Sequence, residues 1–305
     1  MTTTLSRPTA TGIDPTKAGS AAKKKRSALA RSGMALAAVV ATLGGVVAYS
    51  YASTMADIAA HEDRVVAVAE SAGPVVYDTG AEVPEPVARW IEATFDDPSA
   101  IEPMTVSFGF EGDFRRPLTE GFNSVSGSQI VAANEPALVF SATTTMVPGL
   151  FAVAYDAYVE GEMEMKAKIE STITVVNERE TPELNRTSLQ RWLLMSPLYP
   201  TSLLPGGQVT WEAVDDDHAR ATIAAHGEEA SLLFTFGADG RITSVDAETD
   251  GDLTTSYHGS GEHFGVSDYR SIDGVQIPHT FQVARAAGGI TYPFLEASLT
   301  DYQLD

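Results

Sequence analysis

Apolar and polar residues alternate in many short segments after Pro103. Successive side chains of a strand point to opposite faces of a sheet, so this alternation predicts antiparallel strands with one buried and one solvated face. Glycine turns such as Glu160-Gly161 separate the segments. The apolar sets are Val106, Phe108, Phe110 and Phe114; Met163, Met165, Ala167 and Ile169; Val209, Trp211 and Ala213; Ala219, Ala221, Ile223 and Ala225; Leu232, Phe234 and Phe236; and Val275, Ile277, His279, Phe281 and Val283.

Two segments have helical periodicity instead, residues 85–95 and residues 181–197. The second begins with Thr181-Pro182-Glu183, which supplies an N-cap, a first-turn proline and a first-turn acid. Pro197 ends it. The apolar stripes are formed by Val87, Trp90, Ile91 and Phe95 in the first segment, and by Leu189, Trp192 and Leu193 in the second.

The pattern predicts an α+β fold that is mostly β. We expect a single curved antiparallel sheet of about ten strands, a half-barrel or barrel, covered by one or two helices and preceded by an N-terminal transmembrane helix. So many strands with so little helix to cover a flat sheet should curl around their apolar face.

Residues 33–51 contain no charged side chain, and as a helix they would span roughly 28 Å, close to the hydrocarbon thickness of a bilayer. Seven basic residues and one acidic residue precede them. The positive-inside rule then places the N-terminus in the cytoplasm. We expect a retained anchor. A signal peptide cleaved near Ser50, Ala52 and Ser53 and a buried helix of a soluble protein are the alternatives.

These features divide the chain into four parts. We expect a disordered basic cytoplasmic tail (1–32), a transmembrane helix or signal anchor (33–51), a helical stalk and linker (52–83), and an extracytoplasmic β-rich domain (84–305). The predicted location is the bacterial cell membrane, crossed once.

Composition narrows the chemistry of the outer part. Residues 52–305 hold 40 acidic and 13 basic side chains, which argues against binding to nucleic acid and against adsorption on anionic lipid. The 305-residue chain has no cysteine, which excludes disulfides and cysteine-based zinc sites. It has no phosphate-binding loop and no dinucleotide motif. We predict no cofactor and no metal.

Several strings resemble an uncharacterised bacterial family known only as a domain of unknown function. They are PEPVARW (84–90), MVPGLFAVAYDAYVEGEMEMKAKI (146–169), PELNRTSLQRWLLMSPLYPTSLLP (182–205) and DYRSIDGVQIP (268–278). The resemblance covers roughly residues 84–304 and implies no activity. It implies a β-rich fold, similar to the half-barrel of LolA-like lipoprotein carriers.

Possible metal and catalytic motifs have simpler explanations. The acidic run from Asp246 to Asp252 resembles a calcium loop, but its twelfth position is Tyr257 rather than glutamate. His258 and His263 lack a third local zinc ligand. Ser126-Gly127-Ser128 lies within an alternating strand rather than at a nucleophile elbow. The acid pairs Glu111/Asp113 and Glu162/Glu164 fall on the solvated strand face, and we expect them to be ordinary surface.

A candidate ligand site is expected where the apolar strand face meets the helix of residues 181–197. Asp156 should need a partner there, and Arg191 is the expected one. His279 stands on an apolar strand face, as a hydrogen-bonded core histidine or as a ligand contact. The candidate residues are Phe108, Phe110, Asp156, Tyr158, Met163, Met165, Arg191, Trp192, Tyr199, Trp211 and His279.

Three functions remain open from the sequence. The first is a membrane-anchored protein that binds a lipid or another hydrophobic molecule in the half-barrel, because methionine and phenylalanine suit an adaptable pocket. The second is a structural or interaction protein of the cell envelope, with a filled core and an unknown protein partner. The third is a hydrolytic enzyme, which would need polar residues converging in a cleft.

Overall fold

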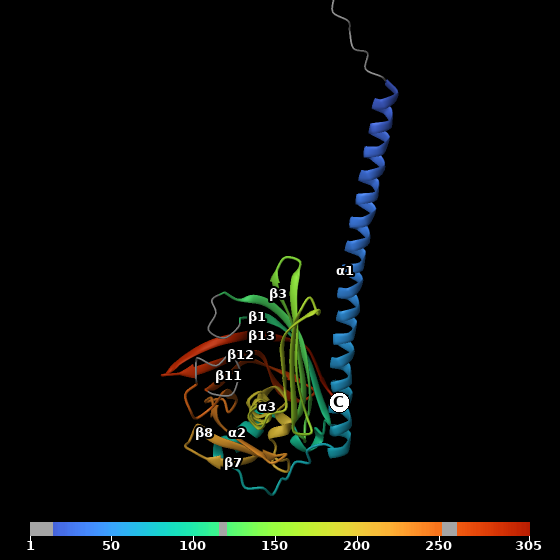
Figure 1. Cartoon of the computed structure of the whole chain (residues 1–305). Helices are drawn as coiled ribbons and strands as arrows, with labels where there is room; N and C mark the ends of the chain where they lie inside the picture. Colours follow the sequence, from blue (N-terminus) through green and yellow to red (C-terminus); the bar gives the residue numbers. More distant parts are fainter. Residues whose placement is uncertain (1–14, 116–120, 252–260) are drawn as a thin grey trace, which may run out of the picture. The chain divides into compact units, whose positions relative to one another are not determined.

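The computed structural model describes residues 15–115, 121–251 and 261–305. In these residues thirteen strands form one antiparallel sheet (Figure 1), in the order β6-β5-β4-β3-β2-β1-β13-β12-β11-β10-β9-β8-β7. The strands are β1 (Thr105–Phe114), β2 (Asn123–Ala132), β3 (Ala137–Val147), β4 (Leu150–Val159), β5 (Glu162–Ile169), β6 (Ile173–Arg179), β7 (Thr210–Ala213), β8 (His218–Ala225), β9 (Glu228–Phe236), β10 (Ile242–Asp246), β11 (Glu262–Ile272), β12 (Val275–Ala287) and β13 (Ile290–Leu304).

The sheet is curved but not closed, because β6 and β7 form its two edges in the described residues. The prediction of about ten strands was therefore too low. Strands β3 and β4 escaped the alternation test because they are covered on both faces, and strands buried on both faces lack polar alternation. The mostly β class and the single antiparallel sheet are confirmed.

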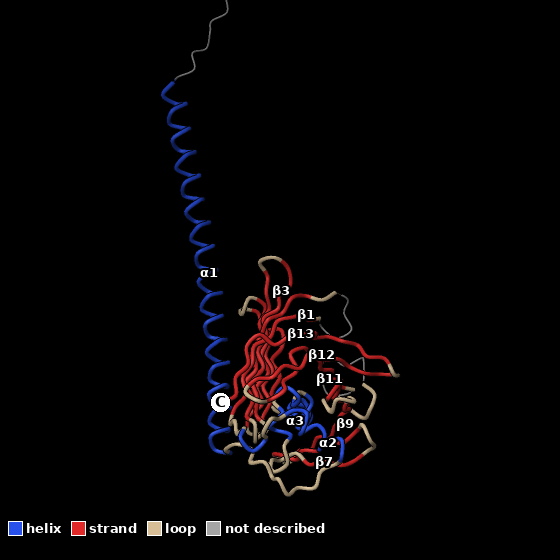
Figure 2. Tube along the Cα trace, turned by 180° about the vertical axis from the view of Figure 1, so that it is seen from behind, coloured by secondary structure: helices blue, strands red, loops and turns tan. Residues whose placement is uncertain are grey.

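The inner face of the sheet holds the main apolar core. Helices α2 (Glu85–Thr94) and α3 (Pro182–Leu194) pack against it, followed by the 3-10 helices η2 (Ser196–Leu198) and η3 (Pro200–Leu203). A further 3-10 turn, η1 (Pro98–Ala100), precedes β1. Figure 2 shows α3 in the hollow of the curved sheet. Residues 181–204, which we call the covering segment, thus lie across the inner face.

Helix α1 (Pro15–Ala72) is one continuous helix that extends over the predicted tail, anchor and stalk. Residues 15–32, for which we expected disorder, belong to it, and their many alanines, lysines and arginines are good helix formers. By length and composition, Ala37–Ala72 contains a candidate membrane span or signal sequence. The chain divides into two compact units, Met1–Ser50 and Tyr51–Asp305.

Residues 51–72 of α1 are part of the second unit and lie on the outer face of the sheet. Ile58, Val65 and Ala69 contact small and β-branched residues of the strands, and Tyr51 meets Phe151 edge to face with ring centroids 6.3 Å apart. The expected helix is present. It is docked on the domain instead of standing apart as a stalk.

Candidate functional site

The residues predicted to form a ligand site come together between the inner face and the covering segment. Phe108, Phe110, Tyr158, Trp192 and Tyr199 are at most 3% exposed. Met163 is buried in the same core, whereas Met165 and Trp211 are partly buried and pack against it. In this structure the predicted site is therefore closed over by the covering segment.

Arg191 of α3 pairs with Asp156 of β4, as the sequence predicts. Asp156 lies opposite Phe140 of β3, so both side chains point to the inner face. The Arg191 guanidinium also lies over the Phe140 ring, 4.6 Å from its centroid. Phe140 in turn stacks on Phe110, with ring centroids 5.2 Å apart. This half-buried ion pair and its ring contact tie the covering segment to the sheet.

The covering segment is held together by its own polar contacts. The Tyr199 hydroxyl donates to the Trp192 carbonyl at 2.5 Å, and the two rings pack 5.8 Å apart. Thr181 caps α3 by accepting a hydrogen bond from the Leu184 amide, as its sequence predicts. Trp211 of β7 donates from its indole nitrogen to the Leu203 carbonyl at 3.1 Å. The first two contacts lie within the segment, and the third ties its end to β7.

Some buried polar atoms under the covering segment have no hydrogen-bond partner among the described residues. They are both amide atoms of Gln129, the Tyr158 hydroxyl and the Trp192 indole nitrogen. Gln129 lies opposite Phe108 and Phe140, and Tyr158 lies opposite Leu138 and Met163, so both side chains are on the inner face. Buried polar groups are normally satisfied, so these atoms mark a place where polar groups of another molecule or of water fit.

His279 differs from the expected hydrogen-bonded core histidine. Neither of its ring nitrogens has a hydrogen-bond partner in the described part of the chain. Its neighbours along the strand on the same face, Ile277 and Phe281, are apolar and offer none. Burial, with the Arg270 charge, lowers the pKa of His279, so the neutral ring is favoured. A ligand contact remains a prediction for this residue.

Glu164 was wrongly expected to be ordinary surface. It accepts hydrogen bonds from the Tyr155 hydroxyl (2.6 Å), and pairs with Lys166 (2.7 Å) and Arg179 (3.0 Å). Burial would raise the pKa of Glu164, but the hydrogen bonds from Lys166 and Tyr155 and the nearby charges hold it below its ordinary value. Burial and the hydrogen bond to Glu164 raise the pKa of Tyr155 to about 12.

This outer cluster joins the sheet to residues 51–72 of α1. Lys168 donates to the Thr54 hydroxyl at 2.9 Å, and the His61 ring lies 3.8 Å from the Glu164 carboxylate. Alternation places Glu164 on the outer face but says nothing of what covers that face. The position of the helix over the outer face was therefore not predicted. Its apolar residues at helical spacing could have indicated that one side of it is buried.

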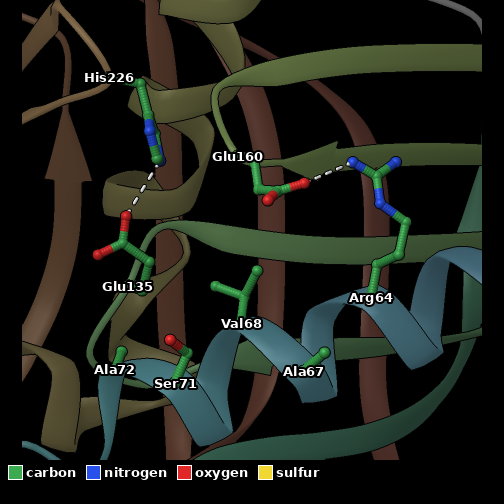
Figure 3. Close-up of a pocket in the computed structure, with 8 residues that line it drawn as sticks. All are labelled: Arg64, Ala67, Val68, Ser71, Ala72, Glu135, Glu160 and His226. Atoms are coloured by element: carbon green, nitrogen blue, oxygen red, sulfur yellow. Dashed lines mark hydrogen bonds and ion pairs between the residues drawn. The ribbon is translucent and has the colours of Figure 1, made fainter.

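A groove of about 480 Å³ runs between the end of α1 and three turns of the sheet. Figure 3 shows Arg64 directed toward Glu160 and His226 directed toward Glu135. The pairs lie 3.0 Å and 3.1 Å apart, so each carboxylate already has a base. Ala67, Val68, Ser71 and Ala72 of α1 form its wall. The groove is open, and both of its carboxylates are already engaged by these contacts.

The remaining motifs have structural roles. Asp246 meets His263 (2.5 Å) and Glu248 binds Arg220, whereas Asp252, Tyr257 and His258 lie outside the described residues. Within the described ranges no group of three acidic or histidine residues is arranged to hold a metal. Gly127 lies under Phe110, where a Cβ atom would come within 2.4 Å of the ring, so Ser126-Gly127-Ser128 is a packing motif in β2.

Comparisons with known proteins identify a family without assigning it a role. A model described as a family of unknown function (DUF6920) matches residues 81–303. None of the curated proteins compared with the chain matches it. The sequence-based resemblance to an uncharacterised family is thus confirmed.

Solved structures give only distant similarity. A LolA superfamily protein from Nitrosomonas europaea is 9% identical, with a TM-score of 0.37, over 72% of this chain and 92% of that one. A DUF1329 family protein from Desulfovibrio piger is 11% identical, with a TM-score of 0.38, over 72% and 91%. The expected LolA superfamily is among the similar structures. Such low scores give no basis for transferring a role to this chain.

Proposed function

The chain belongs to the family of unknown function DUF6920, and we propose that it is a membrane-anchored, extracytoplasmic binding protein for an amphipathic, hydrophobic molecule. Residues 33–51 would cross the bacterial cell membrane once, with the N-terminus in the cytoplasm. The ligand would occupy the inner face of the sheet after the covering segment moves aside. The observation that carries this proposal is the set of polar atoms on Gln129, Tyr158 and Trp192 that are buried in the mostly apolar core without a hydrogen-bond partner in the described part of the chain.

The chemistry of the inner face suits such a ligand. Large apolar side chains from many strands line it, and methionine and phenylalanine adapt to varied hydrocarbon shapes. Burial raises the pKa of Tyr158 to about 12, so its hydroxyl stays protonated and can donate to a carbonyl or phosphate oxygen. The Gln129 amide can both donate and accept. A polar head group would satisfy these atoms while acyl chains replace the side chains of the covering segment.

The covering segment is the element we expect to move. It joins the two edge strands, since it follows β6 and precedes β7, so no strand pairing is lost when it shifts. Breaking the Asp156–Arg191 pair would free its contact with β4, and an anionic head group could then take the place of Asp156 beside Arg191. Displacement exposes a hydrophobic face that only an apolar ligand can cover at low cost.

Mass spectrometry of the full-length protein, extracted from its own membrane under native conditions, tests this proposal. We expect a bound amphiphile on the wild type and on Ser128→Ala, whose change lies next to Gln129 on the exposed side of β2. The double variant Gln129→Leu/Tyr158→Phe should retain far less of it. A wild-type protein that carries no ligand, and takes none up from added lipid, would contradict the proposal.

An envelope protein that acts through its surface is the second candidate. The near-complete burial of Leu189, Trp192 and Tyr199 favours it, because a filled core needs no ligand. The 40 acidic residues after residue 51 would then favour a basic partner. Cross-linking in intact cells, compared between the full chain and a version without residues 1–51, tests this candidate. A partner captured equally by a ligand-free protein would favour it over the binding protein.

A further inference from the structure

One end of the sheet carries exposed apolar side chains, and the charged residue in the turn beside them, Glu170, is turned onto the Phe151 amide at 3.0 Å. The hairpin of β3 and β4 has no charged residue from Pro136 to Tyr155, although the chain after residue 51 holds 40 acids. At its tip Met146 is 42% exposed and Val147 is 54% exposed. An uncharged, apolar hairpin tip on so acidic a domain is unlike a surface that faces only water.

The neighbouring hairpin of β5 and β6 adds to this patch. Ile173 and Val175 on the edge strand β6 are 62% and 53% exposed. The register places them at the same end of the sheet, because Ile173 lies opposite Ile169 and Ile169 lies opposite Ala152, near the start of β4. The four residues Met146, Val147, Ile173 and Val175 form what we call the apolar rim.

The path of the chain brings Tyr51, where the uncharged segment ends, to the end of the sheet that carries this rim. Tyr51, the last residue of the uncharged segment 33–51, packs on Phe151 at the start of β4. Lys168, near the end of β5, binds Thr54 one turn further along the helix. From there α1 passes to the far end of the strands, where Arg64 meets Glu160. The end of the sheet that carries the rim is therefore the end at which the apolar segment stops.

We propose that the apolar rim enters the interface of the same bilayer that holds residues 33–51. This rests on the proposed anchor and names a second, separate membrane contact. Val147 lies two residues past Thr145, the partner of Phe151, which is roughly 7 Å at about 3.3 Å per residue. Tyrosines such as Tyr51 favour the membrane interface, and an apolar group that reaches about 5–10 Å deeper arrives at the acyl boundary.

The contact is hydrophobic in kind. The rim has no basic cluster, and the acidic domain would be repelled by anionic lipid, so electrostatic attraction cannot hold it there. Apolar burial of the four side chains is independent of salt. With the helix docked through the His61–Glu164 and Asp57–Lys166 contacts, the sheet would be held at two places at a fixed orientation to the membrane.

Depth measurement with spin labels on the full-length chain tests the rim. The chain has no cysteine, so single cysteines can be labelled at Val147, Ile173, Val76 and Leu43. Val76, which is 64% exposed and lies beyond the end of α1, serves as the matched control, and Leu43 reports on the anchor. The protein is reconstituted in phosphatidylcholine–phosphatidylglycerol vesicles, and accessibility to oxygen is compared with accessibility to a water-soluble nickel complex.

We expect labels at Val147 and Ile173 to show a severalfold higher oxygen-to-nickel ratio than the label at Val76, unchanged by high salt. Water-like ratios at both positions, with the Leu43 label still in lipid, would contradict insertion of the rim but would support the anchor. A rim signal abolished by salt would also overturn it, since the contact would then be electrostatic. A water-like ratio at Leu43 would remove the anchor and the rim together.

Discussion

The two faces of the sheet are covered in different ways. On the outer face, residues 51–72 of α1 rest on small side chains such as Ala137 and Ala157, and the buried charges of Glu164 and Lys166 satisfy one another. On the inner face, the covering segment rests on large aromatic side chains, and several buried polar atoms have no partner among the described residues, whereas His61 Nδ1 is the one such atom of the helix on the outer face. Under the proposed function, the outer cover is a permanent dock, whereas the inner cover is exchangeable for a ligand.

The largest expected effect is the loss of the central aromatic residue of the inner cover. Trp192→Ala should lower the free energy of unfolding by about 3–5 kcal/mol, because the ring is fully buried. The matched outer change, Val65→Ala, removes two methyl groups and should cost about 1–2 kcal/mol. Urea unfolding of the full-length protein in micelles, followed by the fluorescence of Trp90 and Trp211, compares them. Equal losses of unfolding free energy in the two variants would contradict the difference between the inner and outer covers.

Breaking the ion pair of the inner cover should have the next largest effect. Arg191→Met leaves Asp156 half-buried and without its base, which should cost about 3 kcal/mol. The double variant Asp156→Leu/Arg191→Met should recover most of that loss, since no isolated charge remains. Hydrogen exchange of residues 181–204 reads out the opening of the cover. If amide exchange in residues 181–204 is the same in the single and double variants, the ion pair does not hold the covering segment on the sheet.

Glu164, which joins the outer face of the sheet to residues 51–72 of α1, should contribute less to stability. Glu164→Gln weakens the contacts to Lys166 and Arg179, and we expect a loss of about 1–2 kcal/mol and faster amide exchange in residues 51–72. The control is Glu162→Gln, because the Glu162 side chain, two residues away, is exposed. It should change the free energy of unfolding by less than about 0.5 kcal/mol. Faster exchange in the covering segment would contradict the independence of the two covers.

Acid should loosen the contact between residues 51–72 of α1 and the outer face of the sheet. The pKa of Glu164 is lower in the folded chain than its ordinary value of 4.5. Its contribution to stability is therefore complete above that value and is lost as the pH falls through the lower, folded pKa. Amide exchange in residues 51–72 of the wild type should therefore become faster as the pH is lowered from 6 through this range. The increase should be smaller than the one that Glu164→Gln causes at neutral pH. In Glu164→Gln, amide exchange in residues 51–72 should depend less on pH over the same range.

Sequence pattern predicted those parts of the fold that depend on one strand or helix at a time. The N-cap at Thr181, the apolar stripe of α3 and the Arg191–Asp156 pair are present because local spacing and the cost of a buried charge dictate them. Strands β3 and β4 gave no alternating set because burial on both faces removes alternation, although Asp156 was placed on a strand. Family membership was found from motif strings alone.

The site was predicted only in part, because alternation identifies a face but not its cover. Glu164 lies on the outer face as expected, but only the three-dimensional path of α1 brings a helix over it. The inner face and its cover by the helix of residues 181–197 were predicted, whereas the atoms of Gln129 that lack a partner among the described residues depend on packing between distant segments. Such tertiary contacts leave no periodic trace in the sequence.

The measurement that tests the account most directly is quenching of Trp192 by a brominated fatty acid. The full-length variant Trp90→Phe/Trp211→Phe keeps Trp192 as its single tryptophan, because the chain holds three. We predict saturable quenching at a stoichiometry of one, and its loss in the same background carrying Gln129→Leu/Tyr158→Phe. Fluorescence of Trp192 that stays unquenched as the fatty acid is raised would show that the inner face admits no ligand, and would contradict the account.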